Sequence, residues 1–180
     1  MEDFKALLKG EFLPFGELTD AQLLLLERHY RLLLRWNQKI NLTRITDLAD
    51  AVKYHYCESL YLAKRLPPRP LEIVDIGSGA GFPGIPVAVY RPDCTLDLVE
   101  SHQRKAVFLS EAVRELALPN VRILGVRAED VSRHYEWLVS RAVRPDEILH
   151  LDLAENMSLL CNRGEPLPWG DERGLFHVER

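Results

Sequence analysis

The residues best suited to chemistry lie in a glycine-rich stretch at the end of a short apolar segment. Residues 74–84 read Val-Asp-Ile-Gly-Ser-Gly-Ala-Gly-Phe-Pro-Gly and follow the apolar Leu71 and Ile73. Because glycine has no Cβ, such a loop can turn sharply and let a ligand contact the main chain. The acid before the glycines gives the loop a negative edge, which suits a ligand with positive charge and hydroxyls better than a bare pyrophosphate. The candidate binding residues of this loop are Asp75, Gly77, Gly79 and Gly81.

A second acid ends the next apolar segment. Residues 94–100 read Cys-Thr-Leu-Asp-Leu-Val-Glu and predict a strand that ends at Glu100. A carboxylate at that place, about twenty residues after the glycines, can accept hydrogen bonds from both hydroxyls of a ribose. The order of an acid, three alternating glycines and a strand-end acid favours S-adenosylmethionine (SAM) as the ligand.

An NAD-dependent oxidoreductase is the rival interpretation. Residues 79–84 satisfy the pattern G-x-G-x-x-G, which holds a pyrophosphate on backbone N–H groups at the start of a helix. Pro83 has no N–H to offer, and Asp75 would repel a phosphate. NAD is therefore the less favoured ligand, and a comparison of SAM with NAD would decide between the two.

Composition and charge set the class of protein. The chain has 180 residues, 47% of them hydrophobic, and a net charge of −4, which indicates one globular domain with a helical extension rather than a general nucleic-acid binder. The charge is uneven, because residues 1–70 carry eleven Lys or Arg and nine Asp or Glu. A weakly basic N-terminal part on an acidic body permits RNA contact through one face, although a solvated helix surface gives the same balance.

The sequence further indicates a soluble, cytoplasmic protein without a metal site. Its cysteines form no C-x-x-C pattern, so neither a zinc site nor a disulfide framework is indicated and buried thiols are expected. The first residues lack an apolar signal core, and no apolar run reaches membrane-spanning length. The three cysteines are Cys57, Cys94 and Cys161.

The elements that must position the candidate residues fall into two parts, 1–70 and 71–180. In the first part, the capping-box pattern of residues 19–22 predicts a helix to about Gln38, and a second helix is expected from Asp47 to about Leu66. From residue 71 short strands alternate with helices, which predicts an α/β fold with a parallel sheet whose ligands bind beyond the carboxyl ends of the strands. The expected strands are 71–76, 94–100, 120–125 and 136–141, with helices at 84–90, 102–117 and 127–134. The expected tail elements are a helix at 145–154 and strands at 157–161 and 174–179.

Several segments together resemble one protein family. They are WNQKINLT at 36–43, HYCESL at 55–60, DIGSGAGFPGIP at 75–86, RK at 104–105, RAE at 127–129 and SRA at 140–142. Over about residues 15–145 the chain resembles the RsmG (GidB-like) family. The resemblance implies a Rossmann-like class I SAM-dependent methyltransferase fold with an N-terminal helical extension, and methyl transfer to N7 of a guanosine in the 530-loop region of 16S ribosomal RNA. After Val143 the chain departs from the family, whose members usually have a longer tail, so a SAM-binding protein with an altered substrate or lost catalysis is the alternative.

The resemblance also implies a role for particular residues and partners. Gly77 and Phe82 should border SAM, and Glu100 should bind its ribose. Ala128 and Glu129 should lie beside the adenine, and Arg141, the candidate catalytic residue, beside the methionine part or the target base. The implied partner is small-subunit ribosomal RNA or an assembling 30S subunit. The protein is expected to act as a monomer and not to bind a membrane.

Other residues have a functional and a structural interpretation. His55 and Ser59 share a helix face and are either part of the site or packed and hydrogen-bonded. Asn41 and Thr43 either form a wall of the pocket or stop a helix. Trp169 is expected to cover the core. The basic series that could contact RNA, or simply face solvent, is Arg28, Arg31, Arg35, Lys39 and Arg44.

Overall fold

The N-terminal part of the chain is helical. The computed structural model describes residues 3–141 and 143–179. Helix α1 (Phe4–Phe12) is capped by the Asp3 carboxylate and was not predicted from the sequence. Helix α2 (Asp20–Asn37) confirms the predicted capping box, because Thr19 and Gln22 exchange side-chain and backbone hydrogen bonds.

The second predicted helix is confirmed, with an irregularity in its middle. It consists of α3 (Leu48–Ala51), a π-helical turn η1 (Val52–Cys57) and α4 (Glu58–Arg65). A π turn is wider than an α turn and is a rare feature that often occurs at functional sites. Here it sets the direction of the side chains and carbonyl groups that the helix presents to the sheet.

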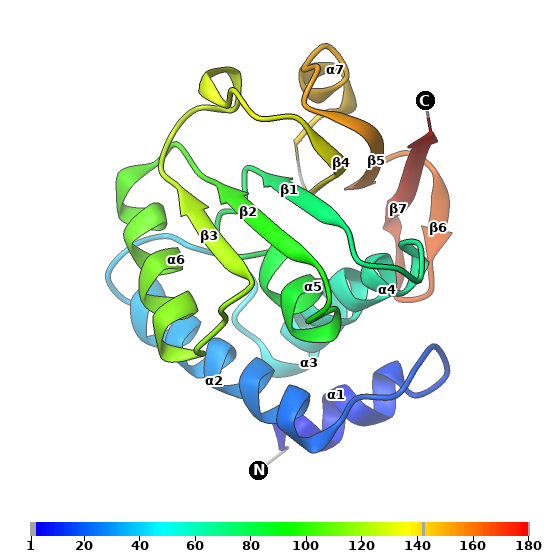
Figure 1. The fold of residues 1–180 in the computed structure, drawn as a ribbon. Helices are drawn as coiled ribbons and strands as arrows, with labels where there is room; N and C mark the ends of the chain where they lie inside the picture. The colour runs from blue at the N-terminus through cyan, green and yellow to red at the C-terminus, as the bar shows by residue number, and fades with distance from the viewer. Residues whose placement is uncertain (1–2, 142, 180) are drawn as a thin grey trace.

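The middle of the chain forms the predicted parallel sheet. Its elements are β1 (Glu72–Ile76), α5 (Gly84–Tyr90), β2 (Thr95–Val99), α6 (Gln103–Glu115), β3 (Val121–Leu124) and β4 (Tyr135–Arg141). Strand β1 lies between β2 and β4, and β3 pairs with the outer side of β2, all in parallel. The carboxyl ends of β1, β2, β3 and β4 therefore meet at one edge of the sheet (Figure 1).

The last part of the chain completes the same sheet. It contributes α7 (Pro145–Ile148), β5 (Ala154–Cys161), β6 (Glu165–Leu167) and β7 (Gly170–Glu179). Strand β5 is parallel to β4, whereas β7 is antiparallel to both β5 and β6. The strand order is β3-β2-β1-β4-β5-β7-β6. Proline in β6 is tolerated because this strand is at the edge of the sheet.

Two helix predictions are wrong. Residues 127–134 contain only a 3-10 turn, η2 (Ala128–Asp130), because a segment this short cannot sustain a helix without a strongly packed face. The predicted helix at 145–154 ends at Ile148. Leucines at 149, 151 and 153 alternate with polar residues, a period of two that favours the extended chain leading into β5.

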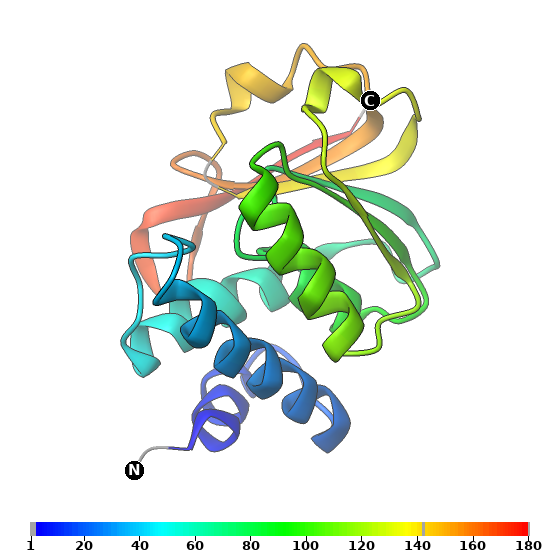
Figure 2. The same ribbon diagram turned by 90° about the vertical axis from the view of Figure 1, so that its left-hand side faces the viewer.

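The helices cover the two faces of the sheet unequally. Helices α4, α5 and α6 pack on one face, with α2 and α1 behind them, whereas η2, α7 and their loops cover the other face (Figures 1 and 2). One continuous apolar core runs from Phe4 in α1 to Leu175 in β7, so the boundary at residue 70 does not divide the core. Among the described residues, no helix is long and apolar enough to span a membrane.

Candidate functional site

The glycine loop turns at the carboxyl end of β1. Gly77, Gly79 and Gly81 all have positive φ, at 70°, 57° and 90°. A Cβ on Gly81 would lie 2.5 Å from the Ile85 side chain, so that glycine is required by packing. A Cβ on Gly79 would meet only the Gly77 carbonyl oxygen at 3.8 Å. Gly79 therefore faces open space, where a ligand can approach the main chain.

Asp75 lies behind the loop and not at its rim. The side chain is fully buried, and its Oδ2 accepts a hydrogen bond from the N–H of Gly84 at 3.0 Å. Its Oδ1 has no hydrogen-bond partner. Burial raises the pKa of Asp75 to about 7, against the opposing effects of the Ser78 hydroxyl and the Gly84 N–H. The carboxylate thus ties β1 to the start of α5 and keeps one buried oxygen unsatisfied.

Glu100 connects the loop to the next helix. Its Oε2 accepts from the Gly79 N–H at 2.9 Å, and its Oε1 accepts from the N–H of His102 at 2.8 Å. Each carboxylate oxygen can accept more than one hydrogen bond, so Glu100 keeps acceptor capacity beside Gly79. This is the place at which the sequence puts a ribose-binding acid.

Phe82 anchors the loop to the helical extension. Its ring is 1% exposed, so the side chain points inward and only the backbone of this residue can border a ligand. The ring of His55 stacks on it at 4.5 Å, and His29 and Tyr56 contact it edge-on at 5.2 and 5.1 Å. The Arg141 guanidinium lies 4.8 Å from the ring centre, which is a cation–π contact.

Arg141 is a half-buried cation with neutral hydrogen-bond partners. Its Nη1 donates to the carbonyl of Tyr54 at 2.8 Å and to Nδ1 of His55 at 2.6 Å. Burial lowers the pKa of Arg141 to about 10, so the side chain stays charged at neutral pH. Within residues 3–141 and 143–179 it makes no salt bridge. The charges of Glu58 and Asp75 raise its pKa but do not offset burial. A guanidinium that lacks a direct ion pair favours a ligand that carries negative charge.

His55 is neutral and has a defined tautomer. Burial and the charge of Arg141 lower its pKa to about 2. Because Nδ1 accepts from Arg141, the ring proton is on Nε2, which donates to the Thr43 hydroxyl at 2.8 Å. His55 is thus packed and hydrogen-bonded, and it links Thr43 to Arg141, so a role of these two residues in the site depends on that of Arg141 and stays a prediction. Ser59 is structural, since its hydroxyl donates to the carbonyl of His55.

Three further polar residues of the site were not predicted. His29 is fully buried, and desolvation lowers its pKa to about 4. It lies 3.1 Å from the Ala80 carbonyl and 3.0 Å from the Tyr56 hydroxyl, and so connects α2 to the glycine loop. Asn37, not Asn41, shapes the 38–43 loop, because its amide binds the backbone of residues 42 and 43. The polar interruption of an apolar helix face was the available signal for His29. Tyr54 contributes a carbonyl, which leaves no signal in a sequence.

The predicted adenine-side residues follow β3 at the same edge. Ala128 is half-buried and Glu129 is exposed, and both lie in the η2 turn. Neither has a side-chain hydrogen bond among the described residues that would compete with a ligand. Their roles stay a prediction. Trp169 is confirmed as cover for the core, since it contacts Phe15 and Tyr61 edge-on.

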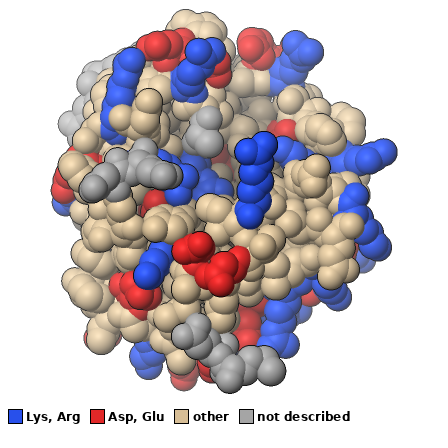
Figure 3. Space-filling view, turned by 180° about the vertical axis from the view of Figure 1, so that it is seen from behind, with Lys and Arg blue, Asp and Glu red and all other residues tan. Residues whose placement is uncertain are grey.

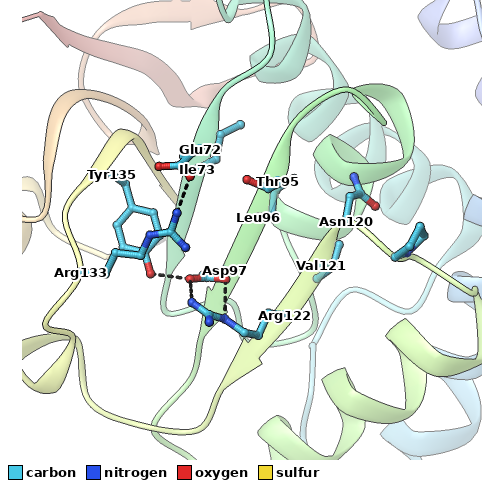
Figure 4. Close-up of a pocket in the computed structure, with 11 residues that line it drawn as sticks. Glu72, Ile73, Thr95, Leu96, Asp97, Asn120, Val121, Arg122, Arg133 and Tyr135 are labelled. Atoms are coloured by element: carbon cyan, nitrogen blue, oxygen red, sulfur yellow. Dashed lines mark hydrogen bonds and ion pairs between the residues drawn. The ribbon is translucent and has the colours of Figure 1, made fainter.

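Another hollow lies at the opposite, amino-terminal ends of the strands. It has a volume of about 290 Å³ and includes Asp97, Arg122 and Tyr135. Its charged groups are paired with one another, as Figure 4 shows: Asp97 with Arg122, and Glu72 with Arg133. The side-chain hydrogen-bonding groups of Asp97 have partners within the protein, so this hollow gives no sign of a ligand.

The predicted basic series divides into two groups. Arg35 forms a salt bridge with Glu115 and Arg28 donates to the carbonyl of Glu115, so these two arginines connect α2 to α6. Arg31 pairs with Glu27 within α2. Lys39 and Arg44 of the series are exposed and make no ion pair within the described chain. Two exposed cations outside the series, Arg104 and Arg127, also lie next to site residues and make no ion pair there. Figure 3 shows a hollowed face on which Lys and Arg side chains lie in and around the hollow.

The cysteines behave as expected. All three thiols are buried and free. Burial raises the pKa of Cys57 and of Cys94, which makes both thiols inert at neutral pH. The described part of the chain holds no group of three or more His, Cys, Asp or Glu side chains placed to bind a metal.

Comparison with known proteins decides the family. The family model "GidB: rRNA small subunit methyltransferase G" matches residues 22–164. The chain belongs to this family. Ribosomal RNA small subunit methyltransferase G of Desulforamulus reducens is 38% identical over 140 residues, which cover 74% of this chain and 58% of that relative. The same protein of Nostoc punctiforme is 44% identical over 128 residues, 65% of this chain and 52% of the relative. The chain thus spans little more than half the length of these two relatives.

Solved structures confirm the fold. A SAM-dependent methyltransferase from Aquifex aeolicus superposes with a TM-score of 0.53 at 15% identity, covering 73% of this chain and 78% of that one. M. jannaschii TYW2, solved in complex with AdoMet, gives a TM-score of 0.51 at 18% identity over 68% of this chain and 54% of that one. At such identities the likeness concerns the fold alone. The GidB-family chain therefore has the predicted Rossmann-like class I methyltransferase fold with a helical extension.

Proposed function

We propose that this protein is a SAM-dependent methyltransferase that modifies N7 of a guanosine in 16S ribosomal RNA, in the 530-loop region by family resemblance. Membership of the methyltransferase G family supports the reaction class. The observation that carries the site is the half-buried, unpaired Arg141 above Phe82 of the glycine loop, at the edge where Glu100 meets Gly79. Arg141 and Glu100 place a cation and an acid on the two sides of an open glycine turn. This arrangement fits a ligand in which an amino acid is joined to a nucleoside.

The residues present fit SAM group by group. Arg141 would hold the carboxylate of the methionine part, because a buried guanidinium with neutral partners gains most from an anion. The open backbone at Gly79 would receive the middle of the ligand, next to Gly77, where a Cβ would meet the Val143 side chain at 3.0 Å. Glu100 would accept from the ribose hydroxyls. Ala128 and Glu129 would read the adenine, and the backbone of Phe82 would border the site. Asp75 would act from behind the loop, where its ionised form favours a cationic ligand.

The start of α5 argues against NAD. A pyrophosphate needs free N–H groups at a helix N-terminus. Here the Gly84 N–H donates to Asp75, and the Ile85 N–H donates to the Gly81 carbonyl at 2.8 Å. Pro83 has no N–H. The helix start is therefore occupied by the protein's own acid and not available to a phosphate.

The proposed chemistry needs positioning more than acid–base catalysis. When bound, SAM supplies an electrophilic methyl group on a sulfonium. Guanine N7 carries a lone pair and no proton, so the protein does not need a strong general base. Its task is to align the two reactants and to exclude water around the positive charge. Arg141 would do the first by fixing the carboxylate, or by donating to guanine O6 in the way arginine commonly recognises this base.

RNA contact would come from the exposed cations beside the site. Arg44 follows Thr43, Arg104 follows the turn bound by Glu100, and Arg127 precedes Ala128. Phosphate contacts weaken steeply as salt rises, because bound counterions are released. Charge reversal at Arg44, Arg104 or Arg127 should flatten the salt dependence of RNA binding. Reversal at Arg31, which is paired with Glu27, is the matched control and should leave that slope unchanged.

The deciding experiment is transfer of labelled methyl from SAM to unmodified 16S ribosomal RNA, free and within 30S subunits, with the product nucleoside identified. We expect N7-methylguanosine at a single site and loss of transfer in Arg141→Ala. Binding of S-adenosylhomocysteine without transfer to any RNA would refute catalysis and leave a SAM-binding module. Preference for NAD over S-adenosylhomocysteine in a thermal-shift comparison would refute the cofactor. We propose that the active species is a monomer, which gel filtration of the active fraction tests.

A further inference from the structure

The β6–β7 hairpin packs against the helical extension next to the site. Trp169, between the two strands, lies 5.0 Å from Phe15 and 6.0 Å from Tyr61. Glu165 of β6 forms an exposed salt bridge with Arg65 of α4 at 2.6 Å. Both contacts fasten the hairpin to the far end of α4. A third contact lies close to Arg141 and has a different character.

This third contact is a largely buried, bidentate ion pair. Arg173 of β7 donates through Nε to Glu58 Oε2 at 2.8 Å and through Nη2 to Oε1 at 3.1 Å. The Glu58 side chain is 4% exposed and that of Arg173 is 24% exposed. A bidentate arginine–carboxylate pair fixes orientation as well as distance. Glu58 is the first residue after the π turn, so the pair holds the end of that turn.

Arg173 also faces the π turn from the sheet side. Its guanidinium lies 5.9 Å from the centre of the Tyr54 ring. At the start of the same strand, a Cβ on Gly170 would come within 3.6 Å of that ring. The carbonyl of Tyr54 and the ring of the next residue, His55, are the two acceptors of Arg141. Strand β7 thus meets the middle of the turn that carries these acceptors, at Tyr54, and the residue that follows the turn, Glu58. The charge of Arg173 also contributes to the lowered pKa values of His55 and Arg141, which agrees with the short distances.

We propose that Arg173 is a positioning residue for Arg141, acting through Glu58 and the π turn at 52–57. Without this ion pair the turn would relax toward regular α-helix and rotate the Tyr54 carbonyl and His55 away from the guanidinium. Arg141 would then lose the orientation that presents its free donors to the ligand. This inference rests on the proposed role of Arg141 in binding the cofactor carboxylate.

The test measures the dissociation constant of S-adenosylhomocysteine by calorimetry, together with the midpoint of thermal unfolding, in the full chain. We expect Arg173→Gln to weaken binding at least tenfold, and Arg173→Lys, which keeps the charge and one hydrogen bond, to recover part of the loss. Arg65→Gln removes the exposed pair of the same hairpin and is the matched control, with binding changed less than twofold. Glu58→Gln should weaken binding too. The double variant, Arg173→Gln with Glu58→Gln, should have a dissociation constant no larger than the larger of the two single-variant values.

Two results would separate the possible failures. If Arg173→Gln or Arg173→Lys lowers the unfolding midpoint but keeps the dissociation constant within twofold, while Arg141→Gln weakens binding, Arg173 is structural only and this inference is overturned. If Arg141→Gln binds as the unchanged protein does, the proposed site itself is wrong. If Arg173→Gln fails to fold, Glu58→Gln and Arg173→Lys decide the question by the same dissociation constants.

Discussion

Two buried aspartates on neighbouring strands have opposite surroundings. Asp75 on β1 is fully buried and Asp97 on β2 is 6% exposed. In the parallel register Val74 pairs with Asp97 and Asp75 with Leu98, so the two carboxylates leave the sheet on opposite faces. They also differ in position along the strands, because Asp75 is near the carboxyl edge and Asp97 is nearer the amino edge.

The partners of the two acids differ in number. Asp97 accepts two hydrogen bonds from Arg122 and one from the Tyr135 hydroxyl, so both of its oxygens are satisfied (Figure 4). Asp75 accepts one backbone hydrogen bond through Oδ2, and its Oδ1 has none. A buried polar atom without a partner costs stability unless something else explains it. We therefore propose that Asp97 serves the fold alone, whereas Asp75, which also ties β1 to α5, has a further role toward a ligand at the binding edge.

The largest expected effect is on the pH dependence of stability in Asp75→Asn. Because the folded-state pKa is raised from 3.8 to about 7, the folded protein holds a proton that the unfolded chain releases between these values. Asp75 therefore makes the free energy of unfolding fall as pH rises through that window, by up to about 4 kcal/mol at about 1.4 kcal/mol per pKa unit. The free energy of unfolding of Asp75→Asn should not fall as pH rises through this window. At pH 8 the variant should therefore be more stable than the unchanged protein.

The difference between the two proteins is the quantity to measure. His29 and His55 have lowered pKa values and contribute the opposite slope, because the stability they provide is present above their unfolded pKa and is lost as pH falls. Both histidines are present in both proteins, so denaturant unfolding from pH 4 to 8 isolates Asp75. Parallel curves for the two proteins would show that Asp75 is ionised throughout. In the unchanged protein, ionisation of Asp75 should also raise the affinity for SAM, which carries a sulfonium, as pH rises near 7, and Asp75→Asn should lack this rise.

The second effect is a stability loss of about 2 kcal/mol in Asp97→Asn. The substitution keeps the size of the side chain but removes the charge that Arg122 binds and weakens the acceptor of the Tyr135 hydroxyl. A hydrogen bond to a charged group contributes about 1.5–3 kcal/mol. Denaturant unfolding at pH 8 should thus give opposite signs for the same Asp→Asn change on two adjacent strands. Equal signs, or a weakened affinity for S-adenosylhomocysteine in Asp97→Asn, would remove the distinction between a structural and a ligand-directed acid.

The sequence predicted the helices and strands better than the surroundings of individual side chains. The alternation of strands and helices from residue 71 predicted the parallel sheet. The helix at 84–90 has the bounds that were expected. Glycines and strand-end acids gave the edge at which Asp75 and Glu100 lie. The sequence could not show which side of the loop Asp75 occupies, because β1 is buried on both faces and its apolar pattern has no polar side.

Contacts between distant segments were the part that sequence patterns missed. Arg173 and Glu58 are separated by 115 positions, and neither belongs to a local motif. The helix expected at 127–134 was wrong for a related reason, since the periodicity of a short polar segment does not reveal whether another element will pack on it.

A smaller effect is expected for Tyr135→Phe. This change removes one hydrogen bond to Asp97, 2.6 Å long, and keeps the ring in its place. Burial raises the pKa of Tyr135 to about 12, so the phenol is neutral at all the pH values considered. We expect a loss of about 1 kcal/mol, less than for Asp97→Asn because Arg122 still satisfies the carboxylate. A loss larger than that of Asp97→Asn would mean that the hydroxyl, not the acid, organises this cluster.

The smallest effect is expected for Glu72→Gln, in the exposed part of the same cluster. Glu72 pairs with Arg133, and both side chains are about half exposed, at 51% and 44%. Exposed ion pairs contribute about 0–1 kcal/mol and are screened by salt. We expect a loss below about 0.5 kcal/mol that disappears in 0.5 M salt, whereas the loss in Asp97→Asn should persist because that carboxylate is buried. A salt-independent loss of stability in Glu72→Gln comparable to that in Asp97→Asn would show that the two ion pairs form one network. Asp97 would then be stabilised by Glu72 as well as by its own hydrogen-bond partners.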